Sequence, residues 1–205
     1  MSERNLVYSS PTPRAALRPL KQPLYDTENV PSAGGAAQLI YFARPIGQNL
    51  AQAPVAAKTL ADTNMTQAQQ LGTPQEFDLY GFNCRLGNTV TVADFQQVMN
   101  QGVFQFFFGQ GRPWLRTQLS DLPTGAGITG STAIDGAAAQ VLNDLPVNAV
   151  PSTREMYNFA VGKKPVRIRS NENFSAQLDW PNANPNPVVF VRVSIILRGI
   201  LYTSL

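Results

Sequence analysis

The sequence predicts an all-β protein, a two-sheet antiparallel sandwich of the jelly-roll type with about eight strands, one short inserted helix and an extended N-terminal arm. The first observation is that apolar and polar residues alternate in short segments such as Asn173–Trp180, a period of two that is typical of half-buried strands. The second is that clusters of Pro and Gly separate these segments and interrupt their hydrogen-bond ladders. The third is a helical period in Thr91–Asn100, which ends at Gly102. Together they fit two sheets that pack into one core.

Residues Met1–Ala37 are expected to form the arm and residues 38–205 the jelly-roll domain. The arm contains five prolines and no sustained apolar period, so we expect neither a helix nor a central strand in it. Its densest basic group lies beside two acids and comprises Arg14, Arg18 and Lys21 next to Asp26 and Glu28. The arm is therefore expected either to be disordered or to dock on its own domain or a neighbour, with at most weak genome contact.

Eight segments have the alternation, or the apolar and β-branched content, of strands. They are Gln38–Arg44, Glu76–Leu86, Val103–Phe108, Trp114–Leu119, Arg154–Ala160, Val166–Arg169, Asn173–Trp180 and Val188–Tyr202. The third and fourth are expected to form a hairpin, and the last three an antiparallel meander. Thr63–Gln70 is a candidate for one short helix. Ser120–Ser152, which has no Lys or Arg, is expected to be a long irregular contact surface.

The residue types of the commonest catalytic and metal-binding sites are missing. The chain has no histidine and a single cysteine, Cys84, so it cannot build a Ser-His or Cys-His pair, a disulfide within the chain or a thiolate metal cluster. Its thirteen acidic residues form no calcium-type loop. We predict no enzymatic activity, and no catalytic, cofactor-binding or metal-binding residues. Cys84 is expected to be a small buried apolar residue, and we recognise no secretory signal or transmembrane segment.

The low charge content indicates extensive protein contact. Charged residues make up 14% of the chain, against about 25% in an average soluble protein, and Asn and Gln carry much of the polarity. Amides can be buried at an interface at a lower free-energy cost than charges. The alternative interpretation of the low charge content is a neutral surface exposed to solvent, without such contacts.

Three stretches resemble virion proteins of bacteriophages. They are Leu39–Gln48, Lys58–Met65, and Pro165–Pro181 together with Val191–Tyr202. The resemblance implies a jelly-roll capsid subunit that self-assembles into an icosahedral shell through its arm and loops. It also implies copies of itself and other virion proteins as partners, and assembly in the host cytoplasm into the virion.

A carbohydrate-binding or receptor-binding β-sandwich, serving in decoration or attachment, is the alternative. Its platform would come from the aromatic residues Trp114, Trp180, Tyr41, Tyr80 and the Phe104–Phe108 cluster. Because most of these lie on alternating strand faces, core packing is the simpler interpretation. A jelly-roll enzyme of the cupin kind is disfavoured, since its usual histidine metal ligands are absent.

Overall fold

A computed structural model describes residues 17–32, 38–52, 54–87, 89–109, 111–122, 141–143, 157–158, 165–182, 185–188 and 190–204. The helices in this part of the chain are α1 (Val92–Gln101) and the 3-10 helix η2 (Leu119–Asp121). The strands are β1 (Leu17–Leu20), β2 (Leu24–Val30), β3 (Gln38–Tyr41), β4 (Glu76–Leu86), β5 (Thr89–Thr91), β6 (Val103–Phe108), β7 (Leu115–Gln118), β8 (Val141–Asn143), β9 (Tyr157–Asn158), β10 (Val166–Ile168), β11 (Phe174–Asp179) and β12 (Val191–Ser204). Each of the eight predicted strands has a counterpart among them.

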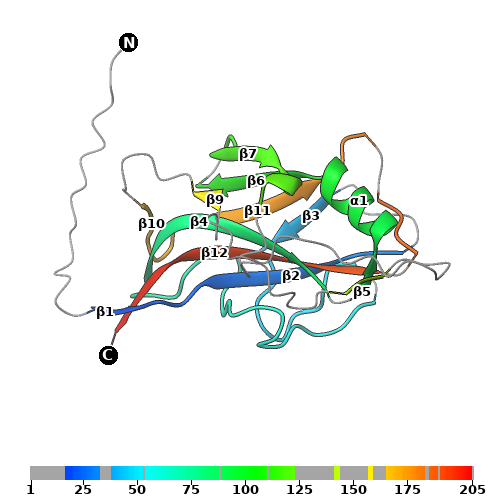
Figure 1. The fold of residues 1–205 in the computed structure, drawn as a ribbon. Coiled ribbons are helices and arrows are strands. Elements are labelled where there is room, and N and C mark those ends of the chain that lie inside the picture. Colours follow the sequence, from blue (N-terminus) through cyan, green and yellow to red (C-terminus); the bar gives the residue numbers. More distant parts are fainter. Residues whose placement is uncertain are drawn as a thin grey trace, which may run out of the picture.

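The strands form two main antiparallel sheets that face each other as layers (Figure 1). In sheet A the order is β1-β12-β4-β10, with β2 beside β12 and β9 beside β4. In sheet B the order is β3-β11-β6-β7, and a separate two-stranded sheet joins β5 to β8. This arrangement is the predicted all-β two-sheet sandwich.

The strand pairing is that of a jelly roll. Along the chain, the eight strands of the sandwich are β2, β3, β4, β6, β7, β10, β11 and β12. The first pairs with the last (β2 with β12), and the pairs β3 with β11, β4 with β10 and β6 with β7 nest inside it. Antiparallel pairing of β12 with β4 joins two of these pairs into sheet A, and pairing of β11 with β6 joins the other two into sheet B. The chain is thus one long folded-over hairpin wrapped around its core, which confirms the predicted jelly roll.

The predicted C-terminal meander was wrong. Strand β10 pairs with β4, β11 pairs with β3 and β6, and β12 pairs with β1, β2 and β4. Successive strands lie in different sheets because the chain crosses the sandwich at each connection. Alternation shows which face of a strand is buried, but it does not show which strand lies beside it.

Within Met1–Ala37, the segment predicted as an arm, residues 17–30 dock on their own domain, one of the alternatives considered, and do so as two strands. Strand β1 pairs with the C-terminal end of β12, and β2 pairs with β12 along seven residues, Leu24–Val30. Pro19 lies in β1, while Pro23 and Pro31 flank β2, and an edge strand tolerates prolines that a central strand would not. Residues 1–16 lie outside the described residues, as does most of Ser120–Ser152.

A bulge in β4 shifts the buried face of that strand. The pairing with β12 passes from Arg198 opposite Gly81 to Gly199 opposite Leu79, which leaves Tyr80 as the extra residue. Phe77 and Leu79 before the bulge are buried, and so are Phe82 and Cys84 after it. The alternation therefore changes phase, and the half-buried Tyr80 does not share the core face that the sequence assigned to it.

The predicted helix is confirmed as α1, at the end of sheet B (Figure 1). The Trp180 indole donates a hydrogen bond of 3.0 Å to the Val98 carbonyl of α1, which ties the helix to the sheet. Thr63–Gln70 forms turns instead of the second helix considered above. In the described part of the chain, no helix has the length and apolar character needed to span a membrane.

Candidate functional site

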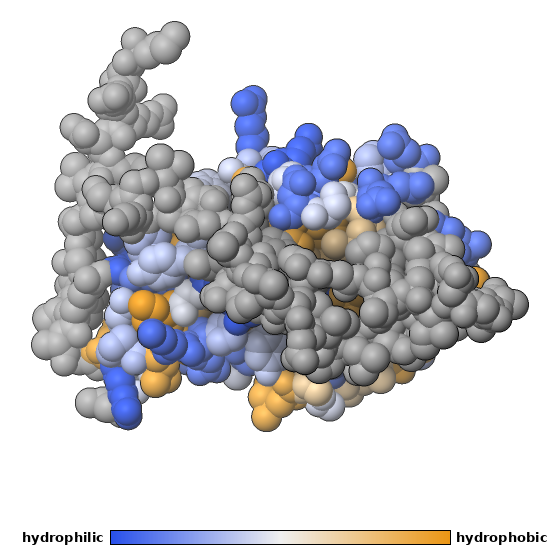
Figure 2. Space-filling model, in the orientation of Figure 1, coloured by the Kyte–Doolittle hydropathy of each residue, from blue (hydrophilic) through white to orange (hydrophobic). Residues whose placement is uncertain are grey.

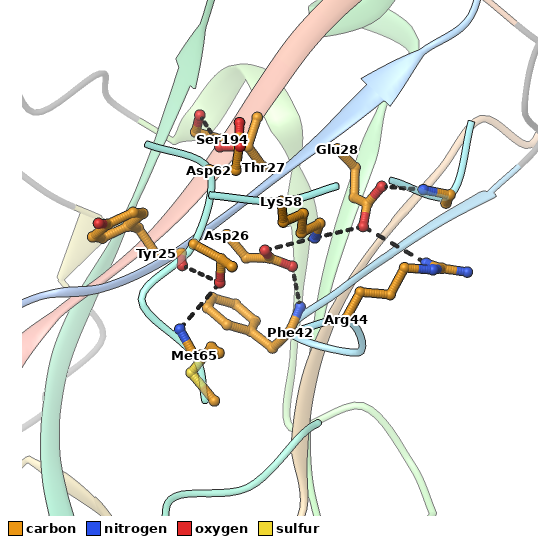
Figure 3. A network of polar contacts seen from close by, with 12 residues as sticks. Tyr25, Asp26, Thr27, Glu28, Phe42, Arg44, Lys58, Asp62, Met65 and Ser194 are labelled. Atoms are coloured by element: carbon orange, nitrogen blue, oxygen red, sulfur yellow. Dashed lines mark hydrogen bonds and ion pairs between the residues drawn. The ribbon is translucent and has the colours of Figure 1, made fainter. Parts of the chain in front are cut away.

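Three charged side chains, Asp26, Glu28 and Lys58, lie together inside the sandwich, and we call them the buried charge cluster (Figure 3). Asp26 and Glu28 are two residues apart on β2, so they share one face of the strand. That face is the core face, because their cross-strand partners Ile195 and Val193 are fully buried. The side chains of all three cluster residues have no exposed surface.

Lys58 enters the cluster from the β3–β4 connection, residues 42–75. Its amide donates a hydrogen bond of 2.8 Å to the Gln48 carbonyl, and its carbonyl accepts one of 2.9 Å from Gly47. These bonds fix the backbone at Lys58, so its side chain is aimed inward between β2 and β3 (Figure 3).

The Lys58 ammonium lies between the two carboxylates. Its Nζ is 2.7 Å from Asp26 Oδ1 and 2.7 Å from Glu28 Oε1. The contact with Asp26 is a hydrogen bond, whereas Glu28 Oε1 is an ion-pair neighbour whose geometry does not meet that of a hydrogen bond. Arg44, which is about one third exposed, approaches Glu28 Oε1 at 3.6 Å from the surface side.

Backbone amides hold the other carboxylate oxygens. Phe42 N–H donates to Asp26 Oδ2 at 2.6 Å, and Ala51 N–H donates to Glu28 Oε2 at 2.8 Å. Burial nevertheless raises the pKa of Asp26 from 3.8 to about 6, against the lowering effects of Lys58 and the Phe42 amide. The cost of placing a charge in a dry site thus exceeds the stabilisation by its neighbours.

The same connection also covers the outer side of β2. Asn29 donates a side-chain hydrogen bond of 3.0 Å to the Pro54 carbonyl, and Asp62 forms an ion pair with Arg192 of β12. Thr63 forms an isolated bridge with Asp26 along the edge of the strand. The connection therefore wraps around the edge of sheet A, where an exposed strand would otherwise be open to pairing with another chain.

The closed position of the cluster limits its chemistry. A general acid or base must reach its substrate within hydrogen-bond distance, and no cluster side chain reaches the surface. The three side chains of the cluster can therefore react only with one another.

Large apolar side chains are exposed mainly on the connections between strands. Ile46, Val55 and Leu60 lie on the β3–β4 connection, and Val55 and Leu60 are 61% and 68% exposed. Val188, 79% exposed, and Phe190 lie just before β12. Figure 2 shows apolar surface on the margin of the molecule where Figure 1 draws the β3–β4 connection below β2. Exposed apolar side chains gathered on a surface are typical of protein contacts.

The aromatic residues considered as a ligand platform differ in burial, and Tyr80, Phe107 and Phe108 are half-buried. Tyr41, Trp180, Phe104 and Phe106 are buried, which confirms core packing for them and removes them as a ligand platform. Trp114, just before β7, remains 44% exposed. Its ring packs edge-on against the buried ring of Phe106, with 6.4 Å between the centroids. Two residues further on, the Arg116 guanidinium donates to Gln105, whose amide donates to Asp179.

A pocket of 270 Å³ opens at the end of sheet A, between β1, β12 and the β3–β4 connection. Its lining includes the apolar residues Leu20, Leu24, Met65, Leu71 and Leu201 and the amides Gln22, Asn64, Gln70 and Gln75. Its volume lies just below the range of about 300–1,000 Å³ that is usual for small-molecule sites. None of its lining residues carries a charged side chain.

No group of three His, Cys, Asp or Glu side chains suited to a metal ion occurs among the described residues. Cys84 is buried, as predicted, and burial raises its pKa to about 12. The thiol is therefore protonated and unreactive in the folded protein.

Comparison with protein-family models, with curated proteins and with solved structures finds no match to this chain. Its function is therefore inferred from its own residues and topology.

Proposed function

We propose that this chain is a structural virion protein, a capsid subunit that self-assembles into an icosahedral shell. Its contacts with other copies would be made by the N-terminal segment 1–16 and by the connections between the strands. The observation that carries the proposal is the position of the exposed apolar side chains, which project from connections at the rim of a jelly roll. The resemblance of three stretches to phage virion proteins supports it, as does the low charge of the chain.

The physical argument concerns the cost of association. A shell subunit buries much of its surface against other copies, so it benefits from contact residues with little charge to desolvate. Val55 and Leu60 are suited to this because the cluster and the Asp62–Arg192 ion pair hold their connection in place. Less conformational entropy is then lost when another subunit binds.

The test is the assembly state of the purified protein. Light scattering coupled to size-exclusion chromatography, over a range of concentration and salt, should detect shells or capsomers that negative-stain images can confirm. Deletion of residues 1–16, or the double change Val55→Ser and Leu60→Ser, should leave a folded protein that assembles poorly. Ala68→Ser, at an exposed position of the same connection, is the matched control. Normal assembly by both altered proteins would refute the proposed contacts.

Trp114 favours a second candidate function, the binding of carbohydrate at the edge of sheet B beside β7. Its exposed ring lies between Arg112 and Arg116 in the chain, and both arginines are exposed. Aromatic rings flanked by polar groups are typical of sugar-binding surfaces. Glycan-array binding that Trp114→Ala abolishes, by a protein that forms no larger assemblies, would support this function over the capsid role.

A further inference from the structure

We propose that Lys58 and Asp26 condense spontaneously to form an amide bond between their side chains, with Glu28 carrying the protons. This modification is independent of the virion role. The bond would join the β3–β4 connection covalently to β2, the first strand of the jelly roll, and so fasten the loop that closes the edge of sheet A.

The first support is proximity. Lys58 Nζ is hydrogen bonded to Asp26 Oδ1 at 2.7 Å, which places the nitrogen in contact with the carboxyl carbon beside that oxygen. Well-oriented groups held together in this way react with effective molarities of about 10⁵ M or more. The backbone on both sides is fixed, by the pairing of β2 with β12 and by the bonds of Lys58 to Gln48 and Gly47.

The second support is the arrangement of donors and acceptors. Glu28 Oε1 lies 2.7 Å from the same nitrogen and makes no conventional hydrogen bond, so it can take a proton from Lys58. On the other side of the reacting carboxyl, Phe42 N–H points at Asp26 Oδ2. A backbone N–H in this position stabilises the negative charge that develops on the oxygen during attack.

The step balances without any further reactant. The ammonium of Lys58 carries three protons. One proton passes by way of Glu28 to Asp26 Oδ1, and the nitrogen lone pair attacks Cγ of the neutral carboxyl group to give a tetrahedral intermediate. Glu28, ionised again, then takes the second proton from nitrogen and delivers it to the same Asp26 oxygen. The C–O bond breaks, water leaves, and the amide keeps the third proton.

The third support is the charge balance of the site. Before condensation, one ammonium and two carboxylates share a site without solvent, and such desolvated charges cost free energy. Condensation removes the charges of Lys58 and Asp26 together. It leaves Glu28 with Arg44, 3.6 Å away, as one ion pair at the edge of the core. Burial raises the pKa of Asp26 to about 6, so the protonated carboxyl, whose carbon is more electrophilic than that of a carboxylate, is accessible near neutral pH.

The test is the mass of the intact protein under denaturing conditions, after incubation of the folded chain. We expect the wild type to be lighter than its sequence by the mass of one water molecule. Chymotrypsin, which can cut after Tyr41 and Phe42, should release a branched peptide that contains both Asp26 and Lys58. A wild-type protein of full sequence mass, with no branched peptide, would overturn the proposal and leave the cluster as an ion pair.

Substitutions assign the roles. Asp26→Ala and Lys58→Met should each have their full sequence mass, and so should Glu28→Gln, which keeps both reacting groups. Circular dichroism establishes that Glu28→Gln is folded. If folded Glu28→Gln still loses water, Glu28 is not the proton carrier. Lys21→Arg, at an exposed lysine just before β2, is the matched control and should retain the mass deficit.

Discussion

Gly199 lies at the bulge between β4 and β12, where the backbone of β4 leaves no room for a side chain. A Cβ at this position would lie 2.2 Å from the Asp78 carbonyl oxygen and 2.4 Å from Phe77 Cζ. Backbone atoms of a central strand cannot move away without disturbing the pairing of β4. Gly199→Ala should therefore lower the free energy of unfolding by about 3 kcal/mol.

Urea unfolding followed by tryptophan fluorescence measures this loss, since Trp180 is buried in the core. Gly72→Ala is the matched control, because its Cβ would meet side-chain atoms at 3.7–3.9 Å, an ordinary contact distance. That change should alter stability by less than about 0.5 kcal/mol. Equal unfolding midpoints for the two variants would show that the close approach at Gly199 does not constrain the bulge.

Two residues of the buried charge cluster could have been recognised from the sequence pattern, and the third could not. Asp26 and Glu28 occupy positions two apart, on the same face as Leu24 and Val30, so the pattern contained two acids on an apolar face. Such acids indicate a buried cation. The partner, Lys58, comes from a loop with no period, and nothing local indicates where its side chain points. The sequence analysis therefore treated the two acids only as charges that oppose the nearby basic residues of the arm.

Strand β10 contains three residues, and a fork of hydrogen bonds from its middle residue reinforces its pairing with β4. Arg167 Nε and Nη2 donate to the two oxygens of Asp78 at 2.7 and 2.8 Å, and Tyr202 donates to the same carboxylate at 3.1 Å. Lysine cannot reproduce this two-point contact. Because Arg167 is 17% exposed, solvent screening is incomplete, and Arg167→Lys should cost about 1 kcal/mol.

The measurement is again the urea midpoint, with Arg85→Lys as the control at an exposed position of β4. Hydrogen exchange of the β10 amides should also become faster in Arg167→Lys, because the loss is local to this edge. A variant with unchanged midpoint and unchanged exchange at β10 would contradict a stabilising role for the fork.

At the scale of elements, the sequence predicted strand positions far better than strand partners. Glu76–Leu86 and Val103–Phe108 were predicted with the bounds that the structure gives. Alternation and turn residues are local properties, so they identify such segments. Pairing depends on contacts between distant parts of the chain, as with β2 and β12. Prolines concealed β1 and β2, since the same residues are typical of an unpaired arm and of an edge strand.

For the whole molecule, the position of β2 sets where the folded unit begins. Strand β2 contributes Leu24 and Val30 to the core and supplies both carboxylates around Lys58. Deletion of residues 1–30 would expose the edge of β12 and leave Lys58 buried without its counter-charges, a loss of several kcal/mol. Deletion of residues 1–16 removes none of these contacts.

We therefore expect the chain without residues 1–16 to keep its circular dichroism spectrum and cooperative unfolding. The chain without residues 1–30 should be insoluble, or should lack a cooperative transition. Size-exclusion chromatography of the two proteins, followed by thermal unfolding, separates these outcomes. A stable, cooperatively folded protein that lacks residues 1–30 would place the start of the domain near residue 38, and would mean that β2 contributes little to the jelly roll that it completes.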